Sequence, residues 1–467
     1  MVEFIKYTGF DHVFWYTGPW LWWLIGLYLC LPLLAYIVFP YFASKGVYSG
    51  KRRTISIFVL GDLGHSPRMC YHARSFSKLE YFVNLCGYLE TQPPLEIIDD
   101  INVDISPISV VKNSQNLPYI LFAIKKVAYQ FIQIMQLLLR FRGSDFIMIQ
   151  NPPSVPILLI VILFIKIFSR NSKLIVDWHN LNYTILNLRF KNLNHPLVRL
   201  VKTYEKVLGK FADFHITVTK SMKKFLRDEF GFKGSPITVL YDRPGPQFKP
   251  ITELDISRSE ILKNHDIFDG IENIGEYKIL MSSTSFTPDE DFNVLLGALK
   301  KYDLTPKLPP ILLIVTGKGP LKDQFLSRVT ELKFSNKVII KSAWLSSEDY
   351  PLILSTADLG VSLHTSSSGI DLPMKIVDFF GCGVPVVSLD FPSIDELVKE
   401  GVNGLITQKA DDSSIQHTEE IYRLLVQAFT DDHLLQKLRD GAILESNLRW
   451  DENWANTLNS RFSYDFK

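Results

Sequence analysis

The 467-residue sequence has few cysteines, no marked excess of charge of either sign and no low-complexity tract. Its four cysteines form no CxxC pair and have no Cys/His spacing typical of metal ligands. A disulfide-stapled scaffold is therefore excluded, and a structural zinc site is not expected. The 50 Lys and Arg residues nearly balance the 49 Asp and Glu residues, so nothing in the net charge of +1 favours nucleic acid as a partner. With 47% hydrophobic and 21% charged residues, the composition is that of a globular chain. The length predicts roughly two to four domains.

Hydrophobic residues concentrate in one run, residues 20–42, which contains no Asp, Glu, Lys, Arg or His. As a helix this run would be about 35 Å long, enough to cross a hydrocarbon core of about 30 Å. Cationic residues such as Lys45 and Arg52 follow it, so the positive-inside rule predicts residues 1–19 in a lumen and the remainder in the cytosol. A cleaved signal peptide is the alternative, but the run is too long and no small-residue cleavage site ends it.

Two further apolar segments leave two interpretations open. Residues 155–165 form a run too short to span a bilayer, and residues 120–141 are apolar with interspersed Lys and Arg. Residues 45–142 carry 12 Lys and Arg against 7 Asp and Glu, a local excess of +5. A basic, apolar face beside a membrane anchor is typical of a second membrane contact. A core helix with solvated ends is the other interpretation.

The remainder of the sequence alternates strand-like and helix-like segments in two halves. Continuous apolar strands separated by helices predict parallel sheets that are covered on both faces. The expected strands are residues 54–60, 145–150, 173–177 and 214–217, then 277–281, 311–315, 337–340, 359–363 and 384–388. Helices are expected at 196–211 and from 419 onward, and a Pro- and Gly-containing stretch from about 242 to 275 predicts a loop-like linker. The sequence thus predicts an α/β protein of two Rossmann-like domains facing a cleft, with ligands bound beyond the carboxyl ends of the strands.

The segment from Ser366 to Asp378 is the strongest candidate for a ligand-binding loop. A Ser- and Gly-containing loop that leads into a helix near Pro373 exposes backbone N–H groups at a positive dipole end, which suits a diphosphate. Lys375 adds a cation one turn later, and the Asp378 carboxylate is suited to accept hydrogen bonds from ribose hydroxyls. An ordinary capped helix is the alternative. The following GCGVPVV, residues 381–387, favours a nucleotide-binding half because it leads a helix end into a new strand.

Six stretches together carry a resemblance to a known family. They are GDLGHSPRM at 61–69, QNPPSVP at 150–156, DWHN at 177–180, SSTSFTPDEDF at 282–292, TGKGP at 316–320 and SSSGIDLPMKIVDFFGCGVPVV at 366–387. The chain resembles the GT-B glycosyltransferases and, among them, the chitobiosyldiphosphodolichol β-mannosyltransferases of the dolichol-linked oligosaccharide pathway. Many GT-B relatives carry two glutamates separated by seven residues in the last stretch. This chain has Asp371 and Asp378, with six residues between them, so the role of the first acid is open.

The resemblance implies a reaction, its substrates and a location. Mannose would move from GDP-mannose to the outer GlcNAc of dolichol-diphosphate-linked chitobiose, with inversion to a β-1,4 bond. This would be the first mannose of the lipid-linked N-glycan precursor, added at the cytosolic face of the endoplasmic reticulum membrane by a single-pass protein. Membrane lipid and other lipid-linked oligosaccharide transferases are expected partners, and no cofactor is expected. A membrane-bound GT-B enzyme that uses a UDP-sugar, and an inactive scaffold paralogue, are the alternatives.

The resemblance also implies a division of the chain into segments. Residues 1–19 would be lumenal and 20–42 transmembrane, followed by an acceptor and membrane-associated domain at 43–245. A linker at 246–276 would precede a GDP-mannose-binding domain at 277–440. Residues 441–467 would form a helical segment that packs back on the N-terminal domain.

An inverting transfer needs a base for the acceptor hydroxyl and stabilisation of the departing diphosphate. His65 and Asp62, in the loop after the first strand, are the candidate catalytic residues, with Asp62 either the base itself, a group that orients His65, or a helix cap. His179 is a third candidate, for which binding of a sugar hydroxyl is the preferred role. Arg68, near the start of the next helix, is expected to hold the acceptor diphosphate.

The expected donor site comes from the second half of the chain. Hydroxyl-rich and glycine-rich loops after two strands, a tryptophan for the guanine base and the 366–378 segment would form it. Its residues are Ser283, Thr284, Ser285, Gly317, Lys318, Gly319, Trp344, Ser368, Gly369, Asp371, Lys375 and Asp378. A core position is the alternative for Trp344. Residues 289–291 match the DxD metal motif superficially, but their position after Pro288 predicts acids in the first turn of a helix, and no metal ligand is expected.

Overall fold

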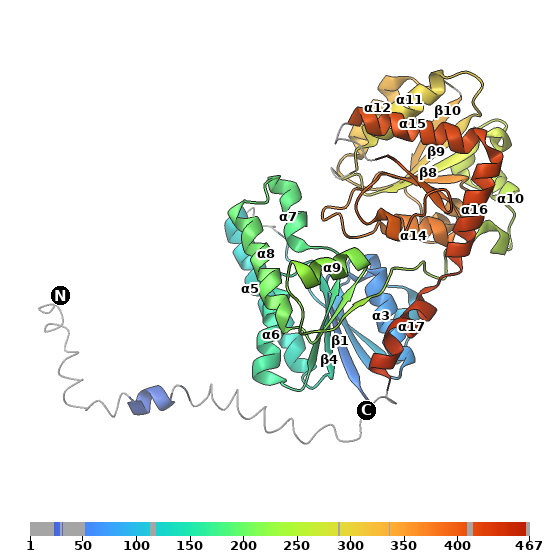
Figure 1. Ribbon diagram of the computed structural model, residues 1–467. Coiled ribbons are helices and arrows are strands. Elements are labelled where there is room, and N and C mark those ends of the chain that lie inside the picture. The colour runs from blue at the N-terminus through green and yellow to red at the C-terminus, as the bar shows by residue number, and fades with distance from the viewer. Residues whose placement is uncertain are drawn as a thin grey trace, which may run out of the picture. The chain divides into compact units, whose positions relative to one another are not determined.

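The computed structural model describes residues 23–28, 30, 52–112, 118–287, 290–335, 337–408 and 414–463 (Figure 1). Its strands form two sheets, one of seven strands and one of six. The first sheet has the order β3-β2-β1-β4-β5-β6-β7, and the second has the order β10-β9-β8-β11-β12-β13. The neighbouring strands whose register is resolved all pair in parallel, as in β1 with β2 and β8 with β9. The prediction of parallel sheets alternating with helices is confirmed.

The first sheet and its helices occupy the first half of the chain. The strands are β1 (Thr54–Asp62), β2 (Phe82–Tyr88), β3 (Val103–Pro107), β4 (Phe146–Asn151), β5 (Lys173–Trp178), β6 (Phe214–Thr217) and β7 (Ile237–Val239). The helices are η2 (Leu63–His65), α3 (Pro67–Lys78), α4 (Leu95–Ile98), α5 (Tyr119–Arg140), α6 (Ile157–Phe168), α7 (Asn182–Phe190), α8 (Pro196–Leu208), η3 (Gly209–Phe211) and α9 (Lys220–Asp228). The apolar runs chosen from the sequence coincide with β1, β4, β5 and β6, because a strand covered on both faces is apolar at every position.

The second sheet follows a connecting segment that is more ordered than expected. The expected linker contains η4 (Ile251–Glu253), α10 (Arg258–Asn264), η5 (Asp266–Phe268) and η6 (Ile274–Glu276). The strands are β8 (Lys278–Thr284), β9 (Ile311–Gly317), β10 (Val338–Ala343), β11 (Leu359–Ser362), β12 (Val386–Ser388) and β13 (Gly404–Ile406). The helices are α11 (Phe292–Leu304), α12 (Lys322–Leu332), α13 (Asp349–Ser355), α14 (Met374–Gly381), η7 (Ile394–Glu396), α15 (Ser414–Thr430), α16 (Asp432–Ser446) and α17 (Trp450–Phe462).

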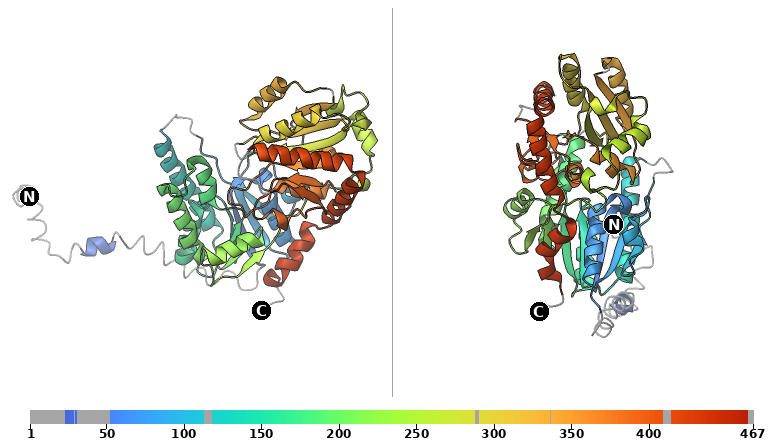
Figure 2. Two further views of the ribbon diagram at one scale, coloured as in Figure 1. Left: turned by 45° about the horizontal axis from the view of Figure 1, so that its top comes forward. Right: turned by 90° about the vertical axis from the view of Figure 1, so that its right-hand side faces the viewer.

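The second sheet is covered on both faces by helices. Alternate residues of β9 point to opposite sides: Leu313 and Val315 pack with α11 and α15, whereas Leu312 and Ile314 pack with α14. In Figure 1, β8 and β9 lie between α11 and α15 on one side and α14 on the other, and Figure 2 gives two further views of the same unit. The period-two alternation of side chains in a strand produces this arrangement, so every residue of β9 is buried. Because the strands themselves are buried, polar side chains lie in the loops at the strand ends.

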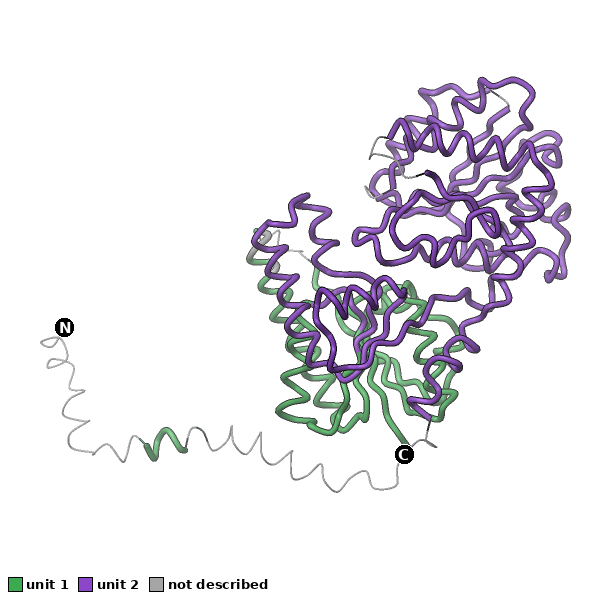
Figure 3. Tube along the Cα trace, viewed as in Figure 1, with its two compact units in different colours: residues 1–149, 155–175 green, residues 150–154, 176–467 purple. Residues whose placement is uncertain are grey.

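The chain separates into two compact units, residues 1–149 with 155–175 and residues 150–154 with 176–467 (Figure 3). The division passes through β4 and β5 rather than through the connecting segment. The expected boundaries at 43–245, 246–276 and 277–440, and the cleft between two domains, stay predictions. Within the second unit, helix α17 packs on β6, where the Phe214 and Phe462 rings are 6.0 Å apart and the Arg461 guanidinium lies 4.5 Å from the Phe214 ring centroid.

Most of the predicted membrane span, residues 20–42, lies outside the described residues. The described residues 23–28 of this span are helical. None of the helices in the described ranges combines the length and the apolar character that crossing a bilayer requires. Helix α5 exposes several apolar side chains, including Leu121 at 56%, Ile124 at 62% and Ile132 at 52%. Helix α6 buries most of its apolar residues but leaves Leu159 and Leu163 about two-fifths exposed, at 41% and 42%.

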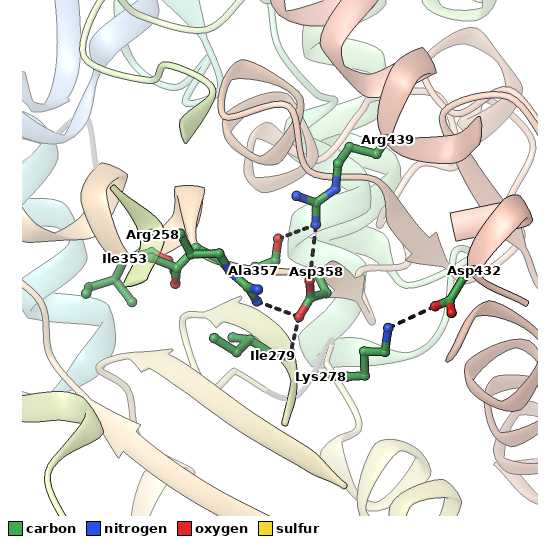
Figure 4. A network of polar contacts seen from close by, with 9 residues as sticks. Arg258, Lys278, Ile279, Ile353, Ala357, Asp358, Asp432 and Arg439 are labelled. Carbon is green, nitrogen blue, oxygen red and sulfur yellow. Dashed lines mark hydrogen bonds and ion pairs between the residues drawn. The ribbon is translucent and has the colours of Figure 1, made fainter. Parts of the chain in front are cut away.

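The Asp358 carboxylate joins four elements of the second unit (Figure 4). It accepts hydrogen bonds from Arg258 of α10 at 2.7 Å, from the Ile279 backbone N–H of β8 at 2.8 Å and from Arg439 of α16 at 3.3 Å. Asp358 itself directly precedes β11 and is 8% exposed. A buried carboxylate with three donors is costly to remove, because two guanidinium groups would lose their counter-charge.

We expect Asp358→Ala to lower the free energy of unfolding by about 3 kcal/mol, because it leaves two partly buried guanidinium groups without their counter-charge. Denaturant unfolding of the full chain in detergent measures this change. Asp432→Ala is the matched control: Asp432 pairs with Lys278 at 3.1 Å, but its side chain is 87% exposed. Such a surface pair contributes under about 1 kcal/mol. Equal losses in the two variants would contradict the role given to Asp358.

Candidate functional site

Two of the predicted donor loops meet at the carboxyl edge of the second sheet. Thr284, at the end of β8, is in register with Gly317, at the end of β9. A Cβ atom on Gly317 would overlap the Thr284 carbonyl oxygen, and one on Gly319 would overlap the Ser285 carbonyl oxygen. Only glycine permits this approach, so the glycine pair is a packing requirement of the two loops. The structure brings these predicted residues together.

Glu290 lies in the same cluster, although the sequence did not predict it as a donor-site residue. Its carboxylate accepts hydrogen bonds from the Thr284 hydroxyl, from the Ser285 backbone N–H at 3.2 Å and from Lys375 Nζ at 2.6 Å. The prediction that residues 289–291 are first-turn helix acids is wrong for Glu290 and Asp291. Helix α11 begins at Phe292, and Asp291 is its N-cap, accepting from the Asn293 N–H at 3.0 Å. No spacing rule links Glu290 to Lys375, because the two residues meet only through the parallel sheet.

Helix α14 carries Lys375 and Asp378 toward this cluster. The Tyr350 hydroxyl, from α13, lies 2.9 Å from Ser283 Oγ and 3.3 Å from Asp378 Oδ2. Burial raises the pKa of Asp378 to about 8, against weaker lowering by the Tyr350 hydroxyl and Lys375. A raised pKa favours the protonated form of the carboxyl group, which can donate a hydrogen bond as well as accept one. Tyr350 is a second residue of this cluster that was not predicted from the sequence.

The Ser366–Asp371 loop is held by residues that follow β5 and β6 in the second unit. Asn180 Nδ2 donates to Asp371 Oδ2 at 2.8 Å and to Ser367 Oγ at 3.2 Å. The Thr219 hydroxyl donates to the Ile370 carbonyl oxygen at 2.5 Å. Burial also raises the pKa of Asp371, to about 6. The predicted sugar-contacting DWHN stretch and the predicted diphosphate loop are thus in direct contact.

Two histidines are each oriented by an aspartate. His179 Nε2 lies 2.8 Å from Asp177 Oδ2, and the Asp177 side chain is fully buried. In the first unit, His65 Nδ1 lies 2.6 Å from Asp62 Oδ2, and the His65 side chain is 66% exposed. Each contact fixes which ring nitrogen faces the carboxylate and leaves the other nitrogen directed elsewhere.

The Asp62 carboxylate accepts several hydrogen bonds. Its Oδ1 accepts the backbone N–H groups of Glu90 and Thr91, each at 3.0 Å. Burial raises the pKa of Asp62, but hydrogen bonds from Thr91, His65 and Glu90 lower it more, so the net shift is downward. Among the roles considered for Asp62, this geometry favours orientation of His65 over proton abstraction. Arg68, on α3 of the same unit, is only 3% exposed.

Trp344 stands at the surface of the second unit. It is 54% exposed, which excludes the core position considered as an alternative. Lys318 Nζ lies 4.1 Å from the centroid of its ring, a cation–π distance. Its assignment to a guanine pocket stays a prediction.

Known proteins match this chain over most of its length. The family model described as "Glycosyl transferases group 1" matches residues 264–428. The chain is 67% identical to a chitobiosyldiphosphodolichol beta-mannosyltransferase of Debaryomyces hansenii, over 99% of this chain and 98% of that protein. It is 37% identical to the protein of the same name from Dictyostelium discoideum, over 86% of this chain and 92% of that protein.

Solved structures share the fold at low sequence identity. Sucrose-phosphate synthase from Thermosynechococcus elongatus aligns with a TM-score of 0.63 at 12% identity, covering 87% of this chain and 97% of that one. WaaG, a glycosyltransferase involved in lipopolysaccharide biosynthesis, aligns with a TM-score of 0.60 at 14% identity, covering 85% and 96%. These two likenesses establish the architecture alone. Given the full-length identities to its curated relatives, the chain belongs to the chitobiosyldiphosphodolichol beta-mannosyltransferase family of GT-B glycosyltransferases.

Proposed function

We propose that this protein transfers mannose from GDP-mannose to the outer GlcNAc of dolichol-diphosphate-linked chitobiose, forming a β-1,4 bond with inversion. One observation carries the proposal beyond the family name. Lys375, the 284–286 loop and the 317–319 loop converge at one edge of the second sheet, next to the start of α14. A lysine, close backbone and a helix start together suit a departing diphosphate.

The reaction is a single displacement at the anomeric carbon of mannose. The acceptor hydroxyl oxygen forms a bond to this carbon while the bond to the GDP phosphate oxygen breaks, and a base takes the hydroxyl proton. Lys375 is proposed to neutralise charge on the leaving GDP, aided by Lys318. Asp378, beside Tyr350, is proposed to bind the ribose hydroxyls. Ser283, Ser368 and Gly369 complete the proposed donor contacts.

For the base we retain His65, oriented by Asp62. Its exposed side chain is accessible to an acceptor, and the contact with Asp62 at Nδ1 leaves Nε2 directed elsewhere. His179, held by buried Asp177 and adjacent to the Asn180–Asp371 contact, is proposed to bind a hydroxyl of the transferred sugar. Arg68 is proposed for the acceptor diphosphate, a role that requires this buried side chain to become accessible.

Membrane attachment completes the proposal. Residues 20–42 would anchor the chain in the endoplasmic reticulum membrane, with residues 1–19 lumenal and the catalytic part cytosolic. The exposed apolar side chains of α5, with Lys125 and Lys126 among them, support a second contact with lipid. Other transferases of the same pathway are proposed partners.

Two alternatives differ in what the donor site would bind. A related GT-B enzyme would use a UDP-sugar, and an inactive scaffold would bind no donor. A scaffold would be expected to lose its donor residues, but Lys375, Asp378 and the 317–319 loop are all present and in contact with partners.

We expect the purified full chain to incorporate mannose from GDP-mannose into a chitobiosyl diphosphate lipid. GDP and GDP-mannose should raise its unfolding temperature, because a ligand that binds only the folded state stabilises that state. UDP-GlcNAc at the same concentration is the matched control and should leave the temperature unchanged. Protection by UDP-GlcNAc instead would favour the UDP-sugar enzyme, and no incorporation from any donor would favour the scaffold.

Activity should persist to a substantial degree in metal-free buffer with chelator, because lysine and a helix start are available to neutralise the leaving group. Initial rates with EDTA, with and without added Mg²⁺ or Mn²⁺, measure this. Complete loss that a divalent ion restores would overturn the assignment.

We expect His65→Ala to slow the single-turnover chemical step by about 10²–10⁴-fold while GDP affinity stays within about twofold. Asp62→Ala should cause a smaller loss, since it removes only the group that orients His65. His179→Ala should weaken donor binding more than it slows chemistry. A larger chemical loss in His179→Ala than in His65→Ala would move the role of base to His179.

A further inference from the structure

The mechanism proposed above leaves one buried charged group of the donor cluster without a role. Glu290 is 6% exposed, belongs to the connection between β8 and α11, and pairs with Lys375 of helix α14. We propose that Glu290 is a positioning residue for the donor: it holds the Lys375 ammonium and the 284–286 loop in the arrangement that receives the diphosphate. This inference rests on the proposed function and deepens it.

The contacts of Glu290 divide between its two oxygens. Oε2 accepts from the Thr284 hydroxyl and the Ser285 N–H, and Oε1 accepts from Lys375 Nζ at 2.6 Å. The first oxygen thus fixes the loop, and the second fixes the lysine. One carboxylate therefore sets the distance between two segments that are about 90 residues apart in the sequence.

Lys375 pairs with Glu290 but keeps N–H groups that can bind a ligand. Its side chain is 28% exposed, whereas that of Glu290 is 4% exposed. An ammonium group has three N–H donors, and the contact with Oε1 occupies one of them. The remaining donors of Lys375 are available to a diphosphate from the exposed side. A long side chain that is already oriented loses less conformational freedom when a ligand binds, and this strengthens binding.

A purely structural role explains these contacts less well. Capping of α11 is performed by Asp291, so Glu290 is not needed to start that helix. A buried ion pair is weak evidence for stability, because its desolvation offsets much of its attraction. The exposure of Lys375 also differs from that of a pair buried for packing, in which both partners are covered.

The test is a double-mutant cycle in the full-length chain, with the dissociation constant of GDP measured by calorimetry. Glu290→Gln keeps the size of the side chain and an acceptor oxygen but removes the charge that holds Lys375. We expect it to weaken GDP binding about tenfold and to raise the KM for GDP-mannose similarly, with kcat within about threefold of wild type. Glu290→Asp, which retains the charge on a shorter side chain, should be intermediate.

The energetic coupling between Glu290 and Lys375 distinguishes a positioning role from a general disturbance of the fold. In a Lys375→Met background, Glu290→Gln should change GDP affinity by less than about twofold, because the residue it acts through is gone. Asp291→Asn is the matched control, since Asn caps a helix as well as Asp does, and it should leave GDP binding unchanged. Unfolding temperatures show that each variant is folded, and Glu290→Asp carries the test if Glu290→Gln does not fold.

Three results would overturn the inference: unchanged or tighter GDP binding in Glu290→Gln, an equal loss in the Lys375→Met background, or an equal loss in Asp291→Asn. Failure of the proposed function is separate. It would appear as wild-type protein that binds neither GDP nor GDP-mannose, whereas failure of this inference alone leaves wild-type binding intact.

Discussion

The donor cluster depends on the parallel arrangement of the second sheet. In a parallel sheet every strand ends at the same edge, so loops from distant parts of the sequence meet there. The loops after β8 and β9 approach each other so closely that only glycine fits at Gly317 and Gly319. The same edge brings Glu290 to Lys375 and Tyr350 to Asp378. A side chain at either glycine would displace Thr284 or Ser285, the two residues that donate hydrogen bonds to Glu290.

Burial of acidic side chains at this edge of the sheet makes their ionisation less favourable. Burial raises the pKa of both Asp371 and Asp378, so ionising either group in the folded chain is less favourable than in water. Because the pKa of Asp378 is raised in the folded chain, its protonation stabilises the fold at low pH. This contribution to the free energy of unfolding is lost as the pH rises from about 4 toward 8. Groups with such perturbed pKa values concentrate where ligands bind, which agrees with the proposed ribose contact.

Much of the architecture was predictable from the sequence, whereas the connections within the site were not. Fully buried strands such as β6 and β9 are continuous apolar runs, so they were found with nearly the observed bounds. Strand β2 was missed because Asn84 and Gly87 interrupt its apolar pattern. Glu290 and Tyr350 were missed for a different reason. Each acts through a partner brought close only by the fold, and neither has a local spacing that marks it.

Helix α17 links the last described part of the chain to a much earlier strand. Its aromatic and cationic side chains cover Phe214 of β6, and Asn453 donates to the Tyr241 carbonyl oxygen at 2.8 Å. During synthesis on the ribosome, this surface stays uncovered until the residues up to Phe462 have left the exit tunnel. A nascent chain that stalls before this point therefore presents the apolar surface around Phe214 to chaperones.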